Sequence, residues 1–294
     1  MSSKLAASIK AGLVLKGVSQ NHLADSVGVS GNTVTSWVKD KHFPDRESLT
    51  ELIQFFGWSK GKVESLLEDW FENEHGEKNY RITGHDFVTL HYDGDYEAFL
   101  TELLALDAST IPGMSEQHAG TPKQWAPIFF QSPYTWRLLV SGDEIVGYWH
   151  FICLKDKFYQ QVLDGKLVDS EIQIDMLDFP VIEGCYKGYF IVITTRVQDR
   201  NPATLALLNF SIEKSFSRYA RNGVFFSDFC ATALSYEGKR MCELMGMEFQ
   251  QRHPRANAGE LADIFQVKGN EIAKSYWGRN NVIRRAYIKQ FDQL

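Results

Sequence analysis

The side chains best suited to contact a partner lie between Gly31 and Lys39, a segment with a helical pattern. Val34 and Trp37 share one side of this predicted helix, which leaves the other side to Asn32, Thr33, Thr35, Ser36 and Lys39. Short hydrogen-bonding groups with few carboxylates match the base edges and phosphates of a major groove. The same polarity would also suit a helix face that only contacts water. We favour a surface for double-stranded DNA.

Two short helices that cross at a steep angle would position this face. Ala24 is small where the helices approach, and Gly28 lies between them, where a left-handed residue reverses the chain at no steric cost. Ser19 and Ser30 precede the two helical patterns as N-caps. The residues that these helices would bury together are Leu23, Val27, Val29, Val34 and Trp37.

This stretch, Ser19 to Lys41, resembles the helix-turn-helix of the Cro/C1 repressor-like (XRE) family. The resemblance covers residues 1–73 and implies an all-α domain of five helices, with Pro44 and Asp45 before the fourth helix and Ser59 before the fifth. It implies that Gln20 meets a phosphate and that a homodimer binds two half-sites about one helical turn apart. The positions that would face bases are Gly31, Asn32, Thr33 and Thr35. Gly31 departs from the family's frequent glutamine or arginine.

Length and charge limit the other possibilities. A chain of 294 residues predicts about two domains. Its net charge of −6 argues against a protein that coats nucleic acid, although Met1 to Ser48 carries six Lys or Arg against four Asp or Glu, a net of +2. The four cysteines are far apart, no histidine pair has metal-ligand spacing, and no signal peptide or membrane span is visible. We expect a cytoplasmic protein without a metal.

After a polar linker, residues 74–84, the pattern changes to that of a mixed α/β domain over residues 85–294. Strands are expected at 87–92, 136–140, 145–154, 189–195, 224–232 and 247–251. Helices are expected at 96–106, 122–130, 158–167, 202–220, 236–245 and 279–290. Ser141 to Glu144 predicts a hairpin turn, and the last helix predicts a packing or dimer element.

The series from Tyr189 to Phe249 resembles the core of the GNAT acetyltransferase fold. In that family a splayed strand runs into a Gln/Arg-x-x-Gly-x-Gly/Ala turn, whose amides hold the pyrophosphate of acetyl-CoA at a helix N-terminus. The resemblance places Gln198, Asp199, Arg200, Asn201, Ala203 and Thr204 in this turn. Asn201 replaces the middle glycine, Pro202 lacks an amide, and Asp199 would repel a phosphate.

The resemblance continues through Met241 to Met247, which is similar to the family's Leu-Tyr-Glu-Lys-Leu-Gly-Phe. Cys242 therefore stands where many members carry a tyrosine general acid, although a small core cysteine would fit there too. A thiol of pKa about 8.5 can protonate a thiolate leaving group. Tyr236 is an alternative proton donor, and Glu183 is the candidate base.

The sequence leaves three possible functions. The first is a transcriptional regulator whose second domain senses a ligand or forms the dimer. The second is an acetyl-CoA-dependent N-acetyltransferase with a DNA-binding module, and the third is a DNA-tethered interaction protein. The helix-turn-helix pattern favours the first, and the altered phosphate turn argues against the second.

Overall fold

A computed structural model describes residues 4–39, 41–59, 61–63, 65–66, 80–111, 114, 116–257 and 261–291. Contacts within the chain divide it into two units, Met1–Tyr80 and Arg81–Leu294. Within the described residues, no helix is both long and apolar enough to cross a bilayer.

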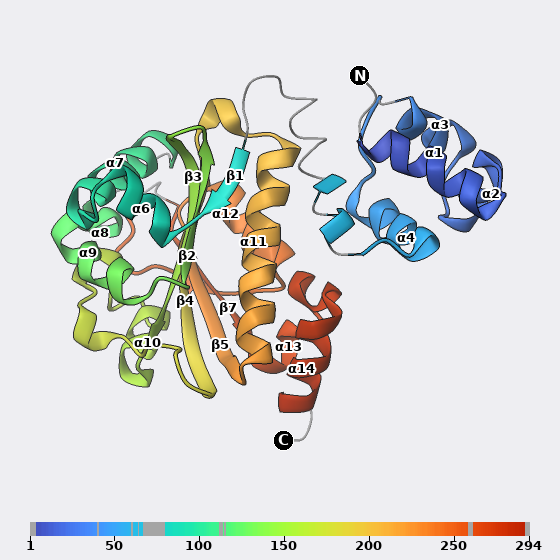
Figure 1. Ribbon diagram of the computed structural model, residues 1–294. Coiled ribbons are helices and arrows are strands. Elements are labelled where there is room, and N and C mark those ends of the chain that lie inside the picture. Colours follow the sequence, from blue (N-terminus) through green and yellow to red (C-terminus); the bar gives the residue numbers. More distant parts are fainter. Residues whose placement is uncertain are drawn as a thin grey trace. The chain divides into compact units, whose positions relative to one another are not determined.

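Four helices form the described part of the first unit up to residue 56: α1 (Lys4–Lys16), α2 (Gln20–Ser26), α3 (Gly31–Val38) and α4 (Arg46–Phe56) (Figure 1). Ser19 Oγ accepts the His22 amide and Ser30 Oγ accepts the Thr33 amide, as N-caps do. Asp45 caps α4 through the Ser48 amide, at 2.8 Å. The core of the unit includes the wholly buried Leu5, Ile9, Leu23, Val34 and Leu52, with Trp37 2% exposed. Val14, next to the buried Leu13 in α1, is 81% exposed.

The predicted fifth helix and the linker fall mostly outside the described residues. Ser59 Oγ does accept the Lys62 amide, as a cap would. The last part of the predicted linker differs from expectation, because Tyr80–Thr83 forms strand β1. Tyr80, Ile82 and Thr83 have high β-propensity, and Tyr80 is buried, which favours the strand over a solvated linker.

The second unit is built on a seven-stranded mixed sheet in the order β1-β2-β3-β4-β5-β7-β6. The strands β2 to β4 are antiparallel neighbours, β4 and β5 are parallel, and β7 and β6 complete the sheet antiparallel to β5. Their bounds are β2 (Trp136–Ser141), β3 (Glu144–Leu154), β4 (Gly184–Thr195), β5 (Val224–Ala233), β6 (Glu248–Arg252) and β7 (Asp263–Lys268). This is the mixed α/β architecture that the sequence predicts.

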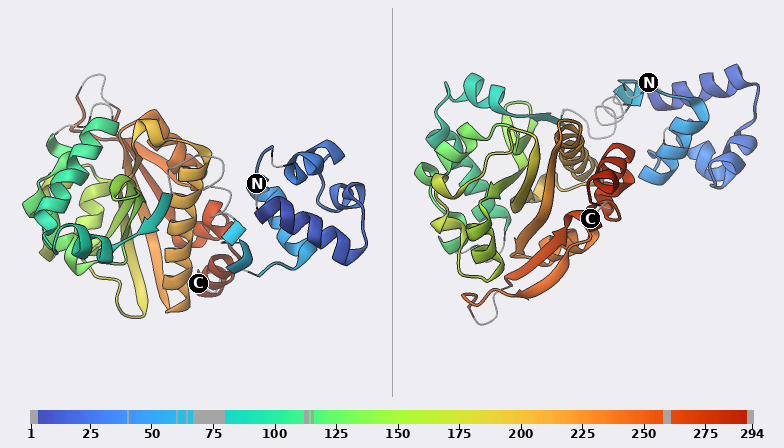
Figure 2. Two further views of the ribbon diagram at one scale, coloured as in Figure 1. Left: turned by 45° about the horizontal axis from the view of Figure 1, so that its top comes forward. Right: turned by 90° about the horizontal axis from the view of Figure 1, so that it is seen from below.

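Helices cover both faces of this sheet (Figures 1 and 2). One face carries α6 (His85–His91), α7 (Tyr96–Thr110), α8 (Glu116–Ala119), α9 (Pro122–Gln131) and α10 (Asp156–Leu163). On the other face, α11 (Pro202–Arg221) contacts β2, β3 and β5 and packs against α14 (Asn281–Phe291). The short helices η1 (Asp169–Glu171), η2 (Ile174–Met176), η3 (Val197–Asp199), α12 (Tyr236–Leu244), α13 (Gly269–Ile272) and η4 (Tyr276–Arg279) join the remaining elements.

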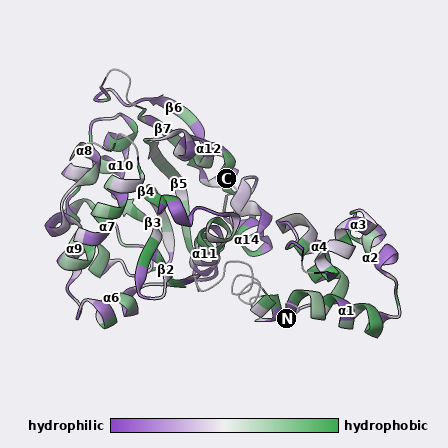
Figure 3. Ribbon diagram, turned by 90° about the horizontal axis from the view of Figure 1, so that it is seen from above, coloured by the Kyte–Doolittle hydropathy of each residue, from purple (hydrophilic) through white to green (hydrophobic). Residues whose placement is uncertain are grey.

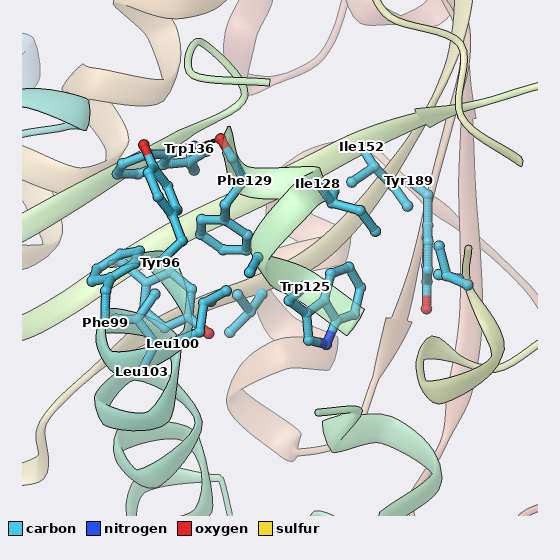
Figure 4. Close-up of a cluster of buried hydrophobic side chains, with 14 of the residues drawn as sticks. Tyr96, Phe99, Leu100, Leu103, Trp125, Ile128, Phe129, Trp136, Ile152 and Tyr189 are labelled. Atoms are coloured by element: carbon cyan, nitrogen blue, oxygen red, sulfur yellow. Dashed lines mark hydrogen bonds between the residues drawn. The ribbon is translucent and has the colours of Figure 1, made fainter. Parts of the chain in front are cut away.

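The core on the α7 side is aromatic and lies against β2, β3 and β4. Figure 4 shows Tyr96 and Phe99 from α7 and Phe129 from α9 near Trp136 of β2, with Trp125 of α9 farther along the cluster. Figure 3 colours β3 and β4 largely as hydrophobic, in keeping with central strands that are buried on both faces. This core fixes α7 and α9 over the sheet.

Two parts of the sequence interpretation were wrong or incomplete. Of residues 87–92, predicted as a strand, 87–91 belong to helix α6 and Tyr92 is its C-cap. Phe87 and Val88 are neighbours and both buried, which a helix allows and a half-buried strand does not. Strand β7 was missed. It lies between β5 and β6, so its apolar residues Ile264, Phe265 and Val267 are buried without the alternation of a surface strand.

Candidate functional site

The predicted phosphate turn lies between β4 and α11, and its residues bind one another. Asn201 has extended backbone angles (φ −149°, ψ 166°), and its carboxamide caps α11. Asn201 Oδ1 accepts the amides of Ala203 at 2.9 Å and Thr204 at 3.0 Å. Thr204 Oγ1 accepts the Asn201 amide at 3.2 Å and donates to the Asp199 carbonyl at 2.7 Å. Since Pro202 has no amide, an anion would have to displace the Asn201 carboxamide.

The charged residues of the turn are also engaged. Asp199 is wholly buried and accepts a 2.6 Å hydrogen bond from Arg196 Nε, so its charge is compensated rather than aimed at a ligand. This corrects the expectation that Asp199 would act by repelling phosphate. Arg200 donates to the carbonyls of Thr195 and Thr110, at 3.0 and 2.8 Å. Gln198 is exposed, whereas Ala203 and Thr204 are buried.

The strands β4 and β5 part in front of this turn. Their paired residues run from Gly184 and Val224 to Phe190 and Ala231. Strand β4 then continues to Thr195 without β5 beside it, while β3 still pairs with it up to Thr195. The sequence resemblance implies such a splayed strand.

The three candidate catalytic residues occupy different places. Glu183 is exposed and precedes β4, so the full length of that strand, roughly 12 × 3.3 Å or about 40 Å, separates it from the α11 turn. Tyr236 is 80% exposed at the start of α12. Cys242 is buried in the same helix, and burial raises the pKa of its thiol to about 12. The structure therefore does not bring Glu183 to the phosphate turn.

A buried polar cluster, which the sequence interpretation missed, lies on the α7 side of β3 and β4. Its carboxylates are Asp107 of α7 and Asp169 of η1, which are 3% and 4% exposed. Tyr148 of β3 donates a short hydrogen bond to Asp107 Oδ2. Tyr189 of β4 donates to Asp169 Oδ1 at 2.6 Å and lies 3.3 Å from Thr232 Oγ1 of β5. The cluster thus links the two strands that part.

Two histidines extend the cluster. His118 Nδ1 lies 3.8 Å from Asp169 Oδ2, and the rings of His118 and His253 are 5.8 Å apart. His118 Nδ1 and Asp107 Oδ1 are buried, and neither has a hydrogen-bond partner within the described residues. Buried polar atoms without a partner are costly, which marks the cluster as a place for a water molecule, a ligand or a mobile proton.

The electrostatics of the cluster favour a held proton. Burial raises the pKa of Asp107 to about 7, and the nearby Asp169 adds to the rise, while the bond from Tyr148 opposes it. Burial raises the pKa of Tyr148 and Tyr189 well above the usual value, so both remain donors. A carboxyl with a pKa near neutrality can accept and return a proton. No pattern along the sequence points to this cluster, because the four residues come from α7, β3, η1 and β4.

In the first unit, the predicted contact residues lie on and beside α3. Asn32 and Lys39 are exposed, while Gly31, Thr33 and Thr35 are partly exposed. Thr35 Oγ1 donates to Gln20 Oε1 of α2 at 3.3 Å, which brings these two together. Gly28 has φ +71°. At Gly31 a Cβ atom would lie 3.0 Å from Oδ1 of the exposed Asn21 side chain.

No metal site is apparent in the described part of the chain, where no group of three or more His, Cys, Asp or Glu could hold an ion. Among the described residues the cysteines are free, with Cys153, Cys230 and Cys242 buried and Cys185 exposed.

Comparison with known proteins gives matches among solved structures alone. No family model matches the chain, and no curated protein does. The loading GNATL domain of CurA from Lyngbya majuscula matches with 12% identity and a TM-score of 0.42, over 64% of this chain and 97% of that one. Arabidopsis thaliana Naa50, in complex with a CoA bisubstrate analogue, matches with 12% identity and a TM-score of 0.39, over 64% and 98%. A GNAT-family putative acetyltransferase from Desulfovibrio desulfuricans matches with 11% identity and a TM-score of 0.38, over 64% and 98%.

Proposed function

We propose that this protein is a sequence-specific DNA-binding regulator, with a helix-turn-helix like that of the XRE family formed by α2 and α3. The observation that carries the proposal is the amphipathic form of α3. Val34 and Trp37 are buried beneath it, and its outer side presents Asn32 and the threonines. The short left-handed turn at Gly28 sets α3 against α2, as recognition by an exposed second helix requires.

The hydrogen bonds assign different roles to these side chains. Ser30 Oγ lies 2.8 Å from Thr33 Oγ1, and Thr35 is bonded to Gln20, so both threonines have protein partners. Among the described residues, Asn32 and Lys39 have no side-chain partner. Asn32 is therefore our main candidate for reading a base, since a carboxamide pairs in a bidentate manner with adenine. Lys39 and Gln20 would contact phosphates, and Gly31 allows close approach of the backbone.

The second unit would then regulate rather than catalyse. The amides that would hold a pyrophosphate, those of Ala203 and Thr204, donate to Asn201 Oδ1 instead. Thr204 Oγ1 in turn accepts a hydrogen bond from the Asn201 amide. We propose that this unit senses a ligand or forms a homodimer. A dimer is needed because one recognition helix buries too little groove surface for discrimination within a genome.

Selection of the duplexes that the full chain binds, from a pool of random sequences, tests the DNA-binding proposal. We expect enrichment of a two-half-site sequence, and loss of preference at one base position per half-site for Asn32→Ala. Enrichment of no sequence would contradict the proposal.

A second candidate is an N-acetyltransferase that uses acetyl-CoA, with the first unit for targeting or autoregulation. Its support is the parting of β4 and β5 next to the Asp107 cluster, where a proton acceptor would serve an acyl transfer. Calorimetric titration with acetyl-CoA separates the two candidates. Micromolar binding by the unmodified chain would favour the enzyme, with Asp107, Cys242 and Tyr236 as the first residues to replace. Absence of binding would leave the regulator.

A further inference from the structure

We propose that Asn21 of α2 reads a base pair at the start of α3, beside Gly31. The inference rests on the proposed function, because it assigns a further contact residue to the same DNA-binding surface. It adds a side chain from the first helix of the motif to those that α3 itself presents. The base pair that suits a carboxamide in the major groove is A·T.

The Asn21 carboxamide lies against the first residue of α3, which is Gly31. Its Oδ1 atom would be 3.0 Å from a Cβ atom placed on Gly31, so this oxygen borders the volume in which a side chain of residue 31 would begin. When a recognition helix enters the major groove, the residues at its N-terminal end contact the base edges. Asn21 therefore stands next to the end of α3 that would reach the bases.

A second contact between the two helices supports this placement. Gly31 and Thr35 are four residues apart in α3 and so lie on one stripe of that helix. Gln20, the residue before Asn21, lies beside Thr35, whose hydroxyl donates to Gln20 Oε1 at 3.3 Å. Two successive carboxamides of α2 thus follow two successive turns of α3, one at Thr35 and the other at Gly31.

The Asn21 side chain is available to a ligand. It is exposed, and it forms no hydrogen bond within the part of the chain that the structure describes. A carboxamide carries both donors and an acceptor, which is the combination that N7 and N6 of adenine require. With Asn32, the surface presents two such asparagines, and we expect two specified A·T pairs in each half-site.

A purely structural role for Asn21 would be the simpler explanation. The first turn of α2 already has its cap, because Ser19 Oγ accepts the His22 amide. Asn21 is exposed and makes no hydrogen bond to α3 among the described residues, so its carboxamide adds little to the stability of the unit. Removal of the carboxamide should consequently change DNA preference without changing the thermal unfolding of the first unit.

Selection of duplexes from a random pool, carried out with the unmodified chain and with Asn21→Ala, tests the proposal. Asn21→Ala should lose the preference for one A·T pair per half-site, at a position other than the one that Asn32→Ala affects. Its affinity for the selected duplex should fall about tenfold, which equals about 1.4 kcal/mol. Gln54→Ala removes an exposed carboxamide from α4 and should match the unmodified chain in preference, affinity and melting temperature.

A double-mutant cycle tests the place that the structure gives to Asn21. Gly31→Ala puts a methyl group 3.0 Å from Asn21 Oδ1, so it should displace the carboxamide and weaken the same base preference. Since both changes act on one contact, the double variant should bind no more weakly than the weaker single variant. Losses that add would show that Gly31 acts independently, and would overturn the placement of Asn21.

The remaining outcomes separate this inference from the proposed function. If the unmodified chain selects a sequence and Asn21→Ala keeps its preference at every position, the inference is overturned and DNA binding stands. The same conclusion follows if Asn21→Ala weakens binding to all duplexes alike, as the loss of a phosphate contact would. Selection of no sequence by the unmodified chain would contradict the proposed function, and this inference with it.

Discussion

Replacement of Asp107 by asparagine should remove a pH dependence from the stability of the second unit. Asp107 is a buried carboxyl whose pKa burial raises from 3.8 to about 7. Because the folded state holds this proton more tightly than the unfolded state, the contribution to stability is complete below pH 3.8 and is lost as the pH rises through 7. The carboxamide of Asp107→Asn would still accept the Tyr148 hydroxyl without ionising.

The magnitude follows from the two pKa values. With 3.8 for the unfolded chain and about 7 for the folded one, the proton linkage lowers the free energy of unfolding by about 2 to 3 kcal/mol between pH 5 and pH 8. Asp107→Asn should lack this decrease. The free energy of unfolding of the variant, relative to that of the parent, should therefore be higher at pH 8 than at pH 5.

Urea denaturation at the two pH values, followed by near-ultraviolet circular dichroism, measures the effect. Asp156→Asn is a suitable control, because it makes the same chemical change at a side chain that is 86% exposed. In the described chain, the Asp156 carboxylate has one cationic partner, Lys187, at 3.7 Å. Equal pH dependence in the parent and in Asp107→Asn would refute the assignment of a neutral-range pKa to Asp107.

Three further predictions address the turn, a phosphate contact and the cofactor site. Gly28→Val should lower the stability of the first unit by about 1 kcal/mol or more in thermal denaturation. The cause would be backbone strain at φ +71° alone, since a Cβ atom would meet nothing within 4 Å. An unchanged melting temperature would contradict this. Lys39→Ala should weaken binding to all duplexes alike and reduce the slope of log affinity against log salt by about one unit; an unchanged slope would remove Lys39 from the phosphate contacts. Asn201→Gly should free the amides that the Asn201 side chain binds, and Pro202→Ala should add one amide at the start of α11. Together they should tighten acetyl-CoA binding at least about tenfold in calorimetry. Equal affinities of variant and parent would show that the turn does not limit binding.

Local chemistry made much of the fold predictable. Ser19, Ser30 and Asp45 cap helices as their side chains suggest, and Gly28 has the left-handed backbone that the turn requires. The long apolar strand β4 and the strongly patterned helix α11 lie where periodicity places them. Residues 87–92 were misassigned, since in so short a segment the apolar period does not distinguish strand from helix.

The candidate sites were less predictable because they depend on contacts distant in sequence. Asp107 and Asp169 are 62 positions apart, and each is bonded to a tyrosine of the sheet, Tyr148 of β3 or Tyr189 of β4. At Asp199 the sequence suggested a repulsive charge, and the nearby Arg196 neutralises it. Asn201 is an exception, because an asparagine directly before a proline at a helix start is the N-cap pattern, in which the side chain binds the amides of its own helix.

The most direct test of the central claim is the affinity of the full chain for the duplex that selection yields, measured against a scrambled duplex at one salt concentration. For Asn32→Ala we expect a loss of about 1 to 3 kcal/mol on the selected duplex and little change on the scrambled one. Asn222→Ala, an exposed asparagine of the second unit, should match the parent on both. Equal affinities of the parent for the two duplexes, or an Asn32→Ala variant that keeps the full preference, would contradict recognition of DNA through α3.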